Sequence, residues 1–349
     1  MKPTQAKQAI TACIKANRPA FLWGAPGTGK SAIIKGIADE MFGNPEQIDK
    51  NGRYHDENGR LASRPYFIDL RATLLDPVDL RGVPKVNGSD KATWCIPDFL
   101  PESGTGILFL DEINTAPLLV QAALYQLILD RKIGDYRLPD GWIVIAAGNR
   151  ATDGAITNRM SSALSNRFVH LTLDIDVADW SQWATENDIN FKIIGFCRFR
   201  PELLHNFDPR STEAAFASCR TWEYLSDIMD TDYPKDIEFE LFSGIIGEAT
   251  AGEFCGFLEI FNKMVNPDTI ILDPKNATIP DDTSALHALC CALSRKATEN
   301  NFGQIATYAG RLPAEFNALL IRDCIKICPE AQNTKAYIKW ATENNEILI

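Results

Sequence analysis

A glycine-rich segment with one lysine and one serine is the part of the sequence best suited to chemistry. It reads Gly24-Ala25-Pro26-Gly27-Thr28-Gly29-Lys30-Ser31, and Ala32 opens the apolar stretch that follows. Glycines let the backbone fold around an anion with its N–H groups pointing at phosphate oxygens. Lys30 adds a positive charge for the β- and γ-phosphates, and the Ser31 hydroxyl can ligate Mg²⁺ at a helix N-terminus. Residues 24–32 therefore predict a binding site for a nucleoside triphosphate with Mg²⁺.

Two adjacent carboxylates, Asp111 and Glu112, follow the apolar run 107–110. Asp111 is expected to hold Mg²⁺ through its water shell, together with Ser31, and Glu112 to orient and polarise the attacking water. The next strand-like run ends at Asn149, whose amide could position the same water or contact the γ-phosphate. An asparagine that only caps a turn is the equal alternative. Together these residues predict hydrolysis as well as binding.

The elements that must position these residues alternate in the first half of the chain, as expected for a parallel sheet covered by helices. Ligands bind at the carboxyl ends of the strands in such sheets, which is where the motifs lie. From residue 174 onward helical periodicity takes over, and the proline-containing stretch 266–282 is predicted to be a loop. We expect an α/β nucleotide-binding domain at 1–175, a helical lid at 176–265 and a C-terminal helical extension at 266–349. The predicted strands are 20–23, 66–70, 107–111, 142–147 and 168–173, and the predicted later helices include 177–184, 286–297 and 314–328.

Composition limits the class of protein. The chain has 349 residues, of which 45% are hydrophobic and 23% charged, so two or more packed domains are expected. A net charge of −11 argues against a dedicated nucleic-acid binder. No apolar stretch approaches the roughly 20 residues that span a bilayer, and no signal-peptide core is seen, so the prediction is a cytoplasmic protein without a membrane partner.

Nine cysteines are scattered along the chain, an odd number that fits reduced and mostly buried thiols. A zinc site is the alternative interpretation. The closest spacings, Cys290-Cys291 and Cys324 with Cys328, include no Cys-x-x-Cys pair and no neighbouring histidines. The pattern therefore favours structural thiols.

The motifs taken together resemble the AAA+ ATPases, and within them the MoxR-like group. The resemblance covers roughly residues 1–260 and rests on the glycine-rich loop and on four later runs. It implies a parallel five-stranded P-loop NTPase (AAA+) core with a helical lid, ATP and Mg²⁺ as cofactors, and chaperone-like work on a protein client. It also implies a homo-oligomeric ring, expected to be a hexamer, and a partner with a von Willebrand factor A (VWA) domain. The four runs are 109–114, 146–149, 165–168 and 219–223.

The resemblance assigns roles to polar residues outside the loop. Asn149 would be sensor 1, and Arg167, just before the last predicted strand, would be an arginine finger that enters a neighbouring subunit's site. The alternative for Arg167 is a surface ion pair. Arg159, eight residues earlier, is a second candidate for the trans-acting charge.

Arg220 would be sensor 2, reaching the phosphates from the helical lid. The family usually has a proline before this arginine, whereas this chain has Cys219. Arg210 is the rival candidate, and the helical residues after Arg220 favour Arg220.

Two further segments match this AAA+ branch. Residues 132–141 are predicted to form a hairpin before the sensor 1 strand, and residues 79–101 an insertion that could grip a polypeptide or be an ordinary solvated loop. The leading hypothesis is a ring ATPase that remodels or activates a protein client. The alternatives are a nucleic-acid-stimulated AAA+ translocase, which the acidic balance disfavours, and a nucleotide-gated scaffold, which has no need of Glu112 or Arg167.

Overall fold

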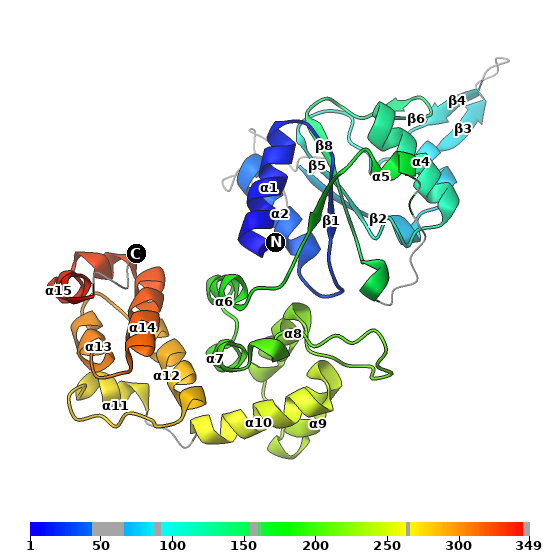
Figure 1. Ribbon diagram of the computed structural model, residues 1–349. Coiled ribbons are helices and arrows are strands. Elements are labelled where there is room, and N and C mark those ends of the chain that lie inside the picture. Colours follow the sequence, from blue (N-terminus) through cyan, green and yellow to red (C-terminus); the bar gives the residue numbers. More distant parts are fainter. Residues whose placement is uncertain (44–65, 87–91, 154–159, 161, 263–265, 345–349) are drawn as a thin grey trace. The chain divides into compact units, whose positions relative to one another are not determined.

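The computed structural model describes residues 1–43, 66–86, 92–153, 160, 162–262 and 266–344 (Figure 1). The chain divides into two compact units. The first comprises Met1–Asp176 with Asp208–Ser211, and the second comprises Val177–Phe207 with Thr212–Ile349. Apart from Asp176 and Asp208–Ser211, the stretches predicted as lid and as C-terminal extension fall in the second unit. Their separation into two domains stays a prediction.

A five-stranded sheet forms the centre of the first unit, and all its strand pairs are parallel. The strand order is β2-β5-β8-β1-β9, which places β1 between β8 and the edge strand β9. The expected α/β fold with a parallel five-stranded core is confirmed, and each strand lies within one or two residues of its predicted bounds. The strands are β1 (Ala20–Trp23), β2 (Phe67–Arg71), β5 (Gly106–Asp111), β8 (Trp142–Gly148) and β9 (Val169–Thr172).

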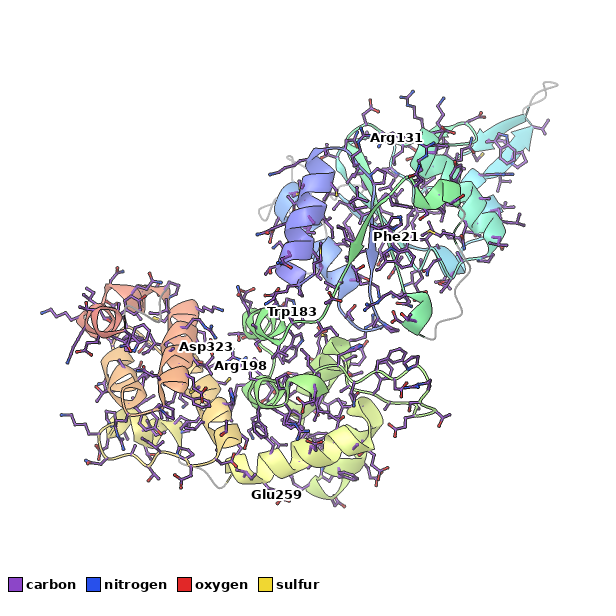
Figure 2. All side chains as sticks on the ribbon, in the orientation of Figure 1. Phe21, Arg131, Trp183, Arg198, Glu259 and Asp323 are labelled. Atoms are coloured by element: carbon purple, nitrogen blue, oxygen red, sulfur yellow. The ribbon has the colours of Figure 1, made fainter. Side chains whose placement is uncertain are left out.

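Helices cover both faces of the sheet, because neighbouring strand residues point to opposite sides. Leu108 of β5 packs in one buried cluster with Leu124 of α4 and with Phe21 of β1, which is labelled in Figure 2. Phe109, the next residue of β5, packs in another buried cluster with Ile34 of α2. The helical segments of this unit are α1 (Pro3–Lys15), α2 (Lys30–Phe42), α3 (Pro77–Arg81), α4 (Leu118–Asp130) and α5 (Ser162–Ser165), with short 3₁₀ turns at Ala72–Leu74 and Ala151–Asp153.

Two hairpins extend the first unit. The hairpin predicted at 132–141 is confirmed as β6 (Lys132–Ile133) paired antiparallel with β7 (Tyr136–Arg137). Arg131 ties it to the sheet by donating hydrogen bonds to the carbonyls of Pro139 (2.6 Å) and Trp142 (2.7 Å). The insertion at 79–101 contains a second antiparallel hairpin, β3 (Val83–Val86) with β4 (Ala92–Cys95).

The described residues of the second unit form helices and connecting loops, without a strand. The predicted helices at 177–184, 286–297 and 314–328 are confirmed as α6, α12 and α14. The predicted loop 266–282 contains the short helix α11, because the Asn266 side chain caps the helix start and Pro267 fits its first turn. The helices are α6 (Val177–Glu186), α7 (Phe191–Phe199), α8 (Cys219–Met229), α9 (Glu238–Ile246), α10 (Glu248–Asn262), α11 (Pro267–Leu272), α12 (Thr283–Arg295), α13 (Phe302–Ala309), α14 (Ala314–Ile327) and α15 (Lys335–Glu343), with 3₁₀ turns at Pro201–Leu203, Lys235–Ile237 and Pro329–Asn333.

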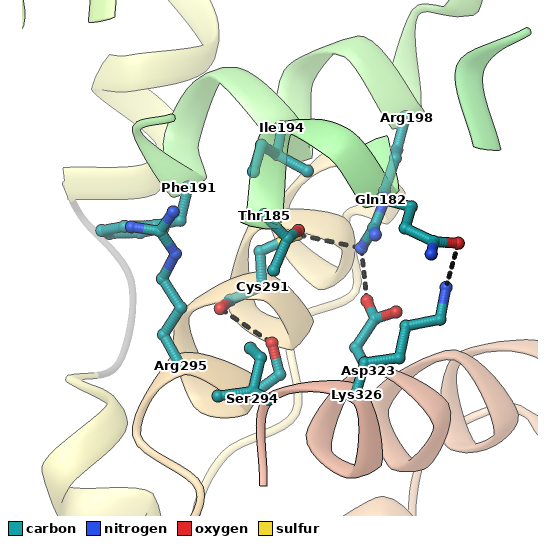
Figure 3. Close-up of a pocket in the computed structure, with 11 residues that line it drawn as sticks. Gln182, Thr185, Phe191, Ile194, Arg198, Cys291, Ser294, Arg295, Asp323 and Lys326 are labelled. Atoms are coloured by element: carbon teal, nitrogen blue, oxygen red, sulfur yellow. Dashed lines mark hydrogen bonds and ion pairs between the residues drawn. The ribbon is translucent and has the colours of Figure 1, made fainter. Parts of the chain in front are cut away.

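A buried ion pair joins three helices of the second unit. Arg198 of α7 donates to Asp323 of α14 and to the sulfur of Cys291 on α12, at 3.2 Å from that sulfur (Figure 3). Both charged side chains are largely shielded from solvent. Removing one partner of a buried pair leaves an uncompensated charge, so this contact fixes how the three helices pack.

Lowering the pH should reduce the free energy of unfolding through His287, which packs on Phe316 near this ion pair. Burial, with a smaller effect of the Arg198 guanidinium, lowers the pKa of His287 to about 4. The unfolded chain therefore binds a proton near pH 6.5 that the folded chain accepts only near pH 4, and stability falls as the pH drops through this window. Between pH 7 and pH 5, His287→Gln should lose about 1 kcal/mol less of its free energy of unfolding than wild type does, allowing for solvent screening. Urea unfolding of both proteins at the two pH values tests this, and parallel losses would contradict it.

The nine cysteines are all described, and all are free thiols. Within the described ranges no group of three or more His, Cys, Asp or Glu side chains could hold a metal ion. None of the described helices combines the length and apolar character needed to cross a membrane.

Candidate functional site

The glycine-rich loop joins the end of β1 to the start of α2 and contains two residues in the left-handed backbone region. Gly27 has φ +75° and Gly29 has φ +82°, values that glycine adopts without steric cost. A Cβ at Gly24 would lie 3.2 Å from Thr28 Oγ1, and that hydroxyl donates to the Ala25 carbonyl at 2.9 Å. The loop is thus a tight, internally bonded turn, shaped to expose backbone N–H groups at a helix N-terminus.

Lys30 points back into this loop. Its Nζ donates to the carbonyls of Gly24 (2.8 Å) and Ala25 (2.9 Å) and to Asn149 Oδ1 (3.0 Å). The lysine is buried, with 9% of its surface exposed, and these three acceptors are neutral oxygens. An anionic oxygen makes a stronger partner for an ammonium than a neutral one, so this cradle fits a phosphate group.

Ser31 and Asp111 meet at the carboxyl edge of the sheet. Ser31 Oγ donates to Asp111 Oδ2 at 3.0 Å, although the two residues are 80 positions apart. Asp111 ends β5, and its Oδ1 accepts a hydrogen bond from the Glu112 N–H at 2.9 Å. A hydroxyl and a carboxylate are hard oxygen donors, the ligand type that Mg²⁺ takes beside water and phosphate. The two residues therefore fit the predicted magnesium ion.

Glu112 occupies an unusual backbone position at the end of β5. Its φ is +56°, in the left-handed region that non-glycine residues seldom adopt. Its carbonyl accepts the N–H (3.0 Å) and the hydroxyl (2.8 Å) of Thr115, and its carboxylate accepts the Thr73 hydroxyl at 3.2 Å. Strained conformations of this kind persist where surrounding contacts enforce them, and they cluster at functional sites. The Glu112 carboxylate is thus held by Thr73, on the residue that directly follows Asp111.

A further carboxylate, Asp69 of β2, adds negative charge at this edge. Partial burial raises the pKa of Asp69, and the nearby Asp111 carboxylate raises it further, while Arg71 opposes the shift. A cation beside the two carboxylates would offset the repulsion that Asp69 experiences from Asp111. The electrostatics of this edge therefore agree with a bound divalent ion.

Asn149 follows β8 and is anchored through its backbone as well as its side chain. Asn114 Nδ2 donates to the Asn149 carbonyl at 2.7 Å, while Asn149 Oδ1 accepts from Lys30. Asn114 is buried, and its Oδ1 lies 2.1 Å from where a Cβ on Gly148 would be. Gly148 thus leaves room for the asparagine that positions Asn149.

The predicted trans-acting arginines differ in what the structure shows of them. Arg167 lies between α5 and β9, is exposed, and forms no hydrogen bond or ion pair through its side chain within the described part of the chain. A surface ion pair, the alternative considered for it, is absent there. Arg159 lies outside the described residues. Arg167 is therefore the candidate whose surroundings are known.

Arg220 lies in the second unit, in the first turn of α8, with its side chain exposed. The start of α8 is fixed by Ser218, whose hydroxyl accepts the Thr221 N–H at 3.2 Å. The rival Arg210 is paired with Asp208 at 3.4 Å. The sensor 2 role of Arg220 stays a prediction.

The structure joins predicted residues of the loop and of the ends of β5 and β8 through hydrogen bonds, and it adds two residues that the sequence interpretation missed. Thr73 donates a hydrogen bond to the Glu112 carboxylate, and Asn114 donates one to the Asn149 carbonyl. Thr73 could have been found, because it is a polar residue just after a predicted strand, at the edge where ligands bind. Asn114 ends the run 109–114 on which the resemblance rests, but the sequence analysis gave it no role. The predicted residues joined in this way are Gly24, Ala25, Thr28, Lys30, Ser31, Asp111, Glu112 and Asn149.

Comparisons with known proteins were made at three levels. Neither protein-family models nor curated protein sequences give a match to the chain. Among solved structures, the chain is similar to NtrX from Brucella abortus in complex with ADP, at 15% identity over 99% of this chain and 68% of that chain, with a TM-score of 0.40. It is also similar to a point mutant of RuvB from Thermotoga maritima, at 18% identity over 83% of this chain and 81% of that chain (TM-score 0.40).

A third similar structure is Hsp104 with ATPγS and FITC casein, at 15% identity over 78% of this chain and 46% of that chain (TM-score 0.36). Similarities of this size do not assign an activity to the chain.

Proposed function

We propose that the chain binds ATP with Mg²⁺ and hydrolyses it. The observation that carries the proposal is the 3.0 Å contact between Ser31 and Asp111, which joins the phosphate loop to the acidic end of β5. Lys30 and Glu112 are the residues next to this pair in sequence, and we assign both to the same reaction centre. Phosphoryl transfer to water requires a positive charge for the phosphates, oxygen ligands for the metal and a base for the water. The Lys30 ammonium, the Ser31 hydroxyl with the Asp111 carboxylate, and the Glu112 carboxylate can supply these groups.

The residues divide the work as follows. Lys30 and backbone N–H groups within residues 27–32 bind the phosphates, and Asn149 orients the Lys30 ammonium. Ser31 and Asp111 hold Mg²⁺, which supplies charge that offsets the phosphate oxygens. Glu112 accepts a hydrogen bond from the attacking water and takes its proton as the water oxygen bonds to the γ-phosphorus. The bond from this phosphorus to the bridging oxygen breaks, and ADP leaves with the electron pair. Thr73 keeps the Glu112 carboxylate in place through its 3.2 Å hydrogen bond.

The assembly that we propose is a homo-oligomeric ring, with six subunits as the expected number. Its support is Arg167, an exposed guanidinium with no side-chain hydrogen bond or ion pair in the described residues. A positive charge from a neighbouring subunit can stabilise the charge that develops on the transferred phosphoryl group. Arg220 would act from the same chain, and Arg159 remains the second candidate for the trans role.

The proposed client is a protein, and the proposed partner carries a VWA domain, as the MoxR-like sequence motifs imply. Apolar side chains that face solvent concentrate within residues 74–119, where they would suit contacts with a polypeptide. They belong to the 3₁₀ turn Ala72–Leu74, to α3, to the β3 and β4 hairpin and the residue after it, and to the start of α4. These residues, between 42% and 76% exposed, are Leu74, Val78, Val83, Val86, Trp94, Ile96, Leu118 and Leu119.

Replacing Lys30 by alanine should abolish measurable ATP binding. The change removes the buried ammonium that lies within hydrogen-bonding distance of both loop carbonyls and Asn149. Titration of a fluorescent ATP analogue measures the effect. Lys35→Ala is the matched control, because Lys35 is an exposed lysine of the same helix. Binding by Lys30→Ala within threefold of wild type would refute the proposed site.

Hydrolysis in a ring should also depend on protein concentration. We expect the specific ATPase activity to rise as subunits assemble, because each site needs an arginine from its neighbour. Activity that stays constant over a hundredfold dilution would contradict the ring. Salt-sensitive stimulation by double-stranded DNA, measured in the same assay, would favour the translocase instead.

A further inference from the structure

A histidine on the edge strand bonds to two segments: the strand that leads into the phosphate loop, and the helix end just before Arg167. His170 of β9 accepts a hydrogen bond at Nδ1 from the indole Nε1 of Trp23, at 2.9 Å. Its Nε2 lies 2.7 Å from the Ser165 carbonyl oxygen and 3.2 Å from Ser165 Oγ. Trp23 is the last residue of β1, directly before the phosphate loop, and Ser165 is the last residue of α5.

The two partners of His170 fix its tautomer. An indole N–H can only donate, so Nδ1 must be the unprotonated acceptor. The imidazole proton is then on Nε2, from which it can donate to the Ser165 carbonyl, an acceptor that has no proton of its own. Although His170 is exposed, both of its ring nitrogens form hydrogen bonds within the protein. A histidine that contacts only solvent would form neither.

Aromatic packing holds the histidine in this orientation. Its ring stacks near the Trp23 indole, with 6.0 Å between centroids, and the Trp23 indole stacks on Phe21 at 4.1 Å. Phe168, the residue after Arg167, packs edge-on against Phe21 at 5.4 Å. Trp23, Phe168 and His170 are therefore one contact group, which we call the aromatic link.

The aromatic link surrounds the short turn that carries Arg167. The turn has two backbone bonds, from the Arg167 N–H to Leu164 (3.1 Å) and from the Phe168 N–H to Ser165 (3.3 Å). Since the Arg167 side chain has no hydrogen bond or ion pair in the described residues, its direction depends on how this turn is held. His170 bonds to the Ser165 carbonyl on one side of Arg167, and Phe168 packs on the other.

We propose that His170 is a positioning residue that holds the Arg167 turn against the strand leading into the phosphate loop, so that Arg167 is presented to the neighbouring subunit. The inference rests on the proposed trans role of Arg167. This role requires no cavity and no contact between His170 and the nucleotide, and His170 does not touch the reacting atoms. Its loss should impair the site of the neighbouring subunit and leave the chain's own nucleotide binding intact.

His170→Phe tests this, because phenylalanine keeps a ring of similar size but loses both hydrogen bonds. We expect kcat to fall about 10- to 100-fold, the cost of misplacing a catalytic group by roughly 1 Å. The ATP dissociation constant should stay within twofold. Thr172→Val, an exposed change on the same strand and the same face, is the control and should alter neither. An unchanged kcat in His170→Phe would overturn the proposal.

Mixing subunits separates positioning in trans from damage in cis. Lys30→Ala subunits cannot use nucleotide but keep an intact Arg167 turn, so they should restore hydrolysis in the sites of His170→Phe neighbours. Glu112→Gln mixed with Lys30→Ala should show no recovery, because both defects are in cis. Absent recovery with His170→Phe, together with weaker ATP binding, would mean that the histidine only supports the phosphate loop.

Two comparisons keep the test independent of folding and of the ring proposal. Trp23→Phe removes the indole donor but keeps a ring, and it should lower kcat about 3- to 10-fold, the effect of one lost hydrogen bond. It carries the test if His170→Phe does not fold. Recovery in an Arg167→Ala and Lys30→Ala mixture shows that the trans arginine is correct, so failure of the His170 mixture alone then refutes only the positioning role.

Discussion

Arg167→Ala is expected to bind ATP as tightly as wild type and to hydrolyse it about 10³- to 10⁵-fold more slowly, the range typical of arginine fingers. Binding should survive because Lys30, Ser31 and Asp111 are contributed by the chain's own loop and strand, and Arg167 contacts none of them through a hydrogen bond or ion pair. Steady-state ATPase rates and nucleotide titration measure the two quantities. Arg18→Ala, an exposed arginine of the same unit, should leave both unchanged.

A mixing experiment decides whether Arg167 acts between subunits. In equal random mixtures of Arg167→Ala and Lys30→Ala, a site is active when it has Lys30 and its neighbour has Arg167. That combination occurs in about a quarter of the positions of a head-to-tail ring. Activity near a quarter of wild type, from two inactive proteins, is the expected result. A mixture that stays inactive would place Arg167 outside the reaction.

Glu112→Gln should bind Mg-ATP normally and lose about 10²- to 10⁴-fold in hydrolysis, the usual contribution of a general base. Glutamine has the same shape and can still accept the Thr73 hydroxyl, so the contacts around this residue are kept. It cannot take a proton from water. Single-turnover hydrolysis beside nucleotide titration measures the effect, and a loss of binding would refute the division of labour between Lys30 and Glu112.

The same variant reports on assembly, because it should stay in the ATP-bound state. Mass photometry of Glu112→Gln with and without Mg-ATP is expected to show a shift from small species to a closed ring. A constant mass distribution would contradict nucleotide-dependent assembly of the chain alone. Wild-type protein with Mg-ADP is the control that separates the effect of ATP from that of any nucleotide.

The strands and the loop were predictable from the sequence because their signals are local. The run 107–111 is apolar and ends in a carboxylate, and it forms β5 with one additional residue at its start. The glycines of the loop occupy the left-handed conformations that their residue type suggests. The helix α11 was missed, because the asparagine cap at its start prevailed over a composition typical of loops.

The remaining parts of the site depend on contacts between distant segments. Thr73 reaches Glu112 because β2 and β5 pair in a register that sets Arg71 beside Asp111, and no local pattern encodes that register. The Asn114 amide bonds to a strand end 35 residues away. The role of Arg220 depends on how one unit is placed on the other, which a helix signal in the sequence cannot supply.

Gly148 illustrates a constraint that works on pairs of positions. It is required at the end of β8 because the neighbouring Asn114 side chain fills the volume that a methyl group would need. Related chains should therefore vary at these two positions together: a larger residue at 148 would be accompanied by a smaller one at 114. Correlated substitution at positions 114 and 148 in an alignment would therefore reflect the side-chain packing that positions Asn149 in this chain.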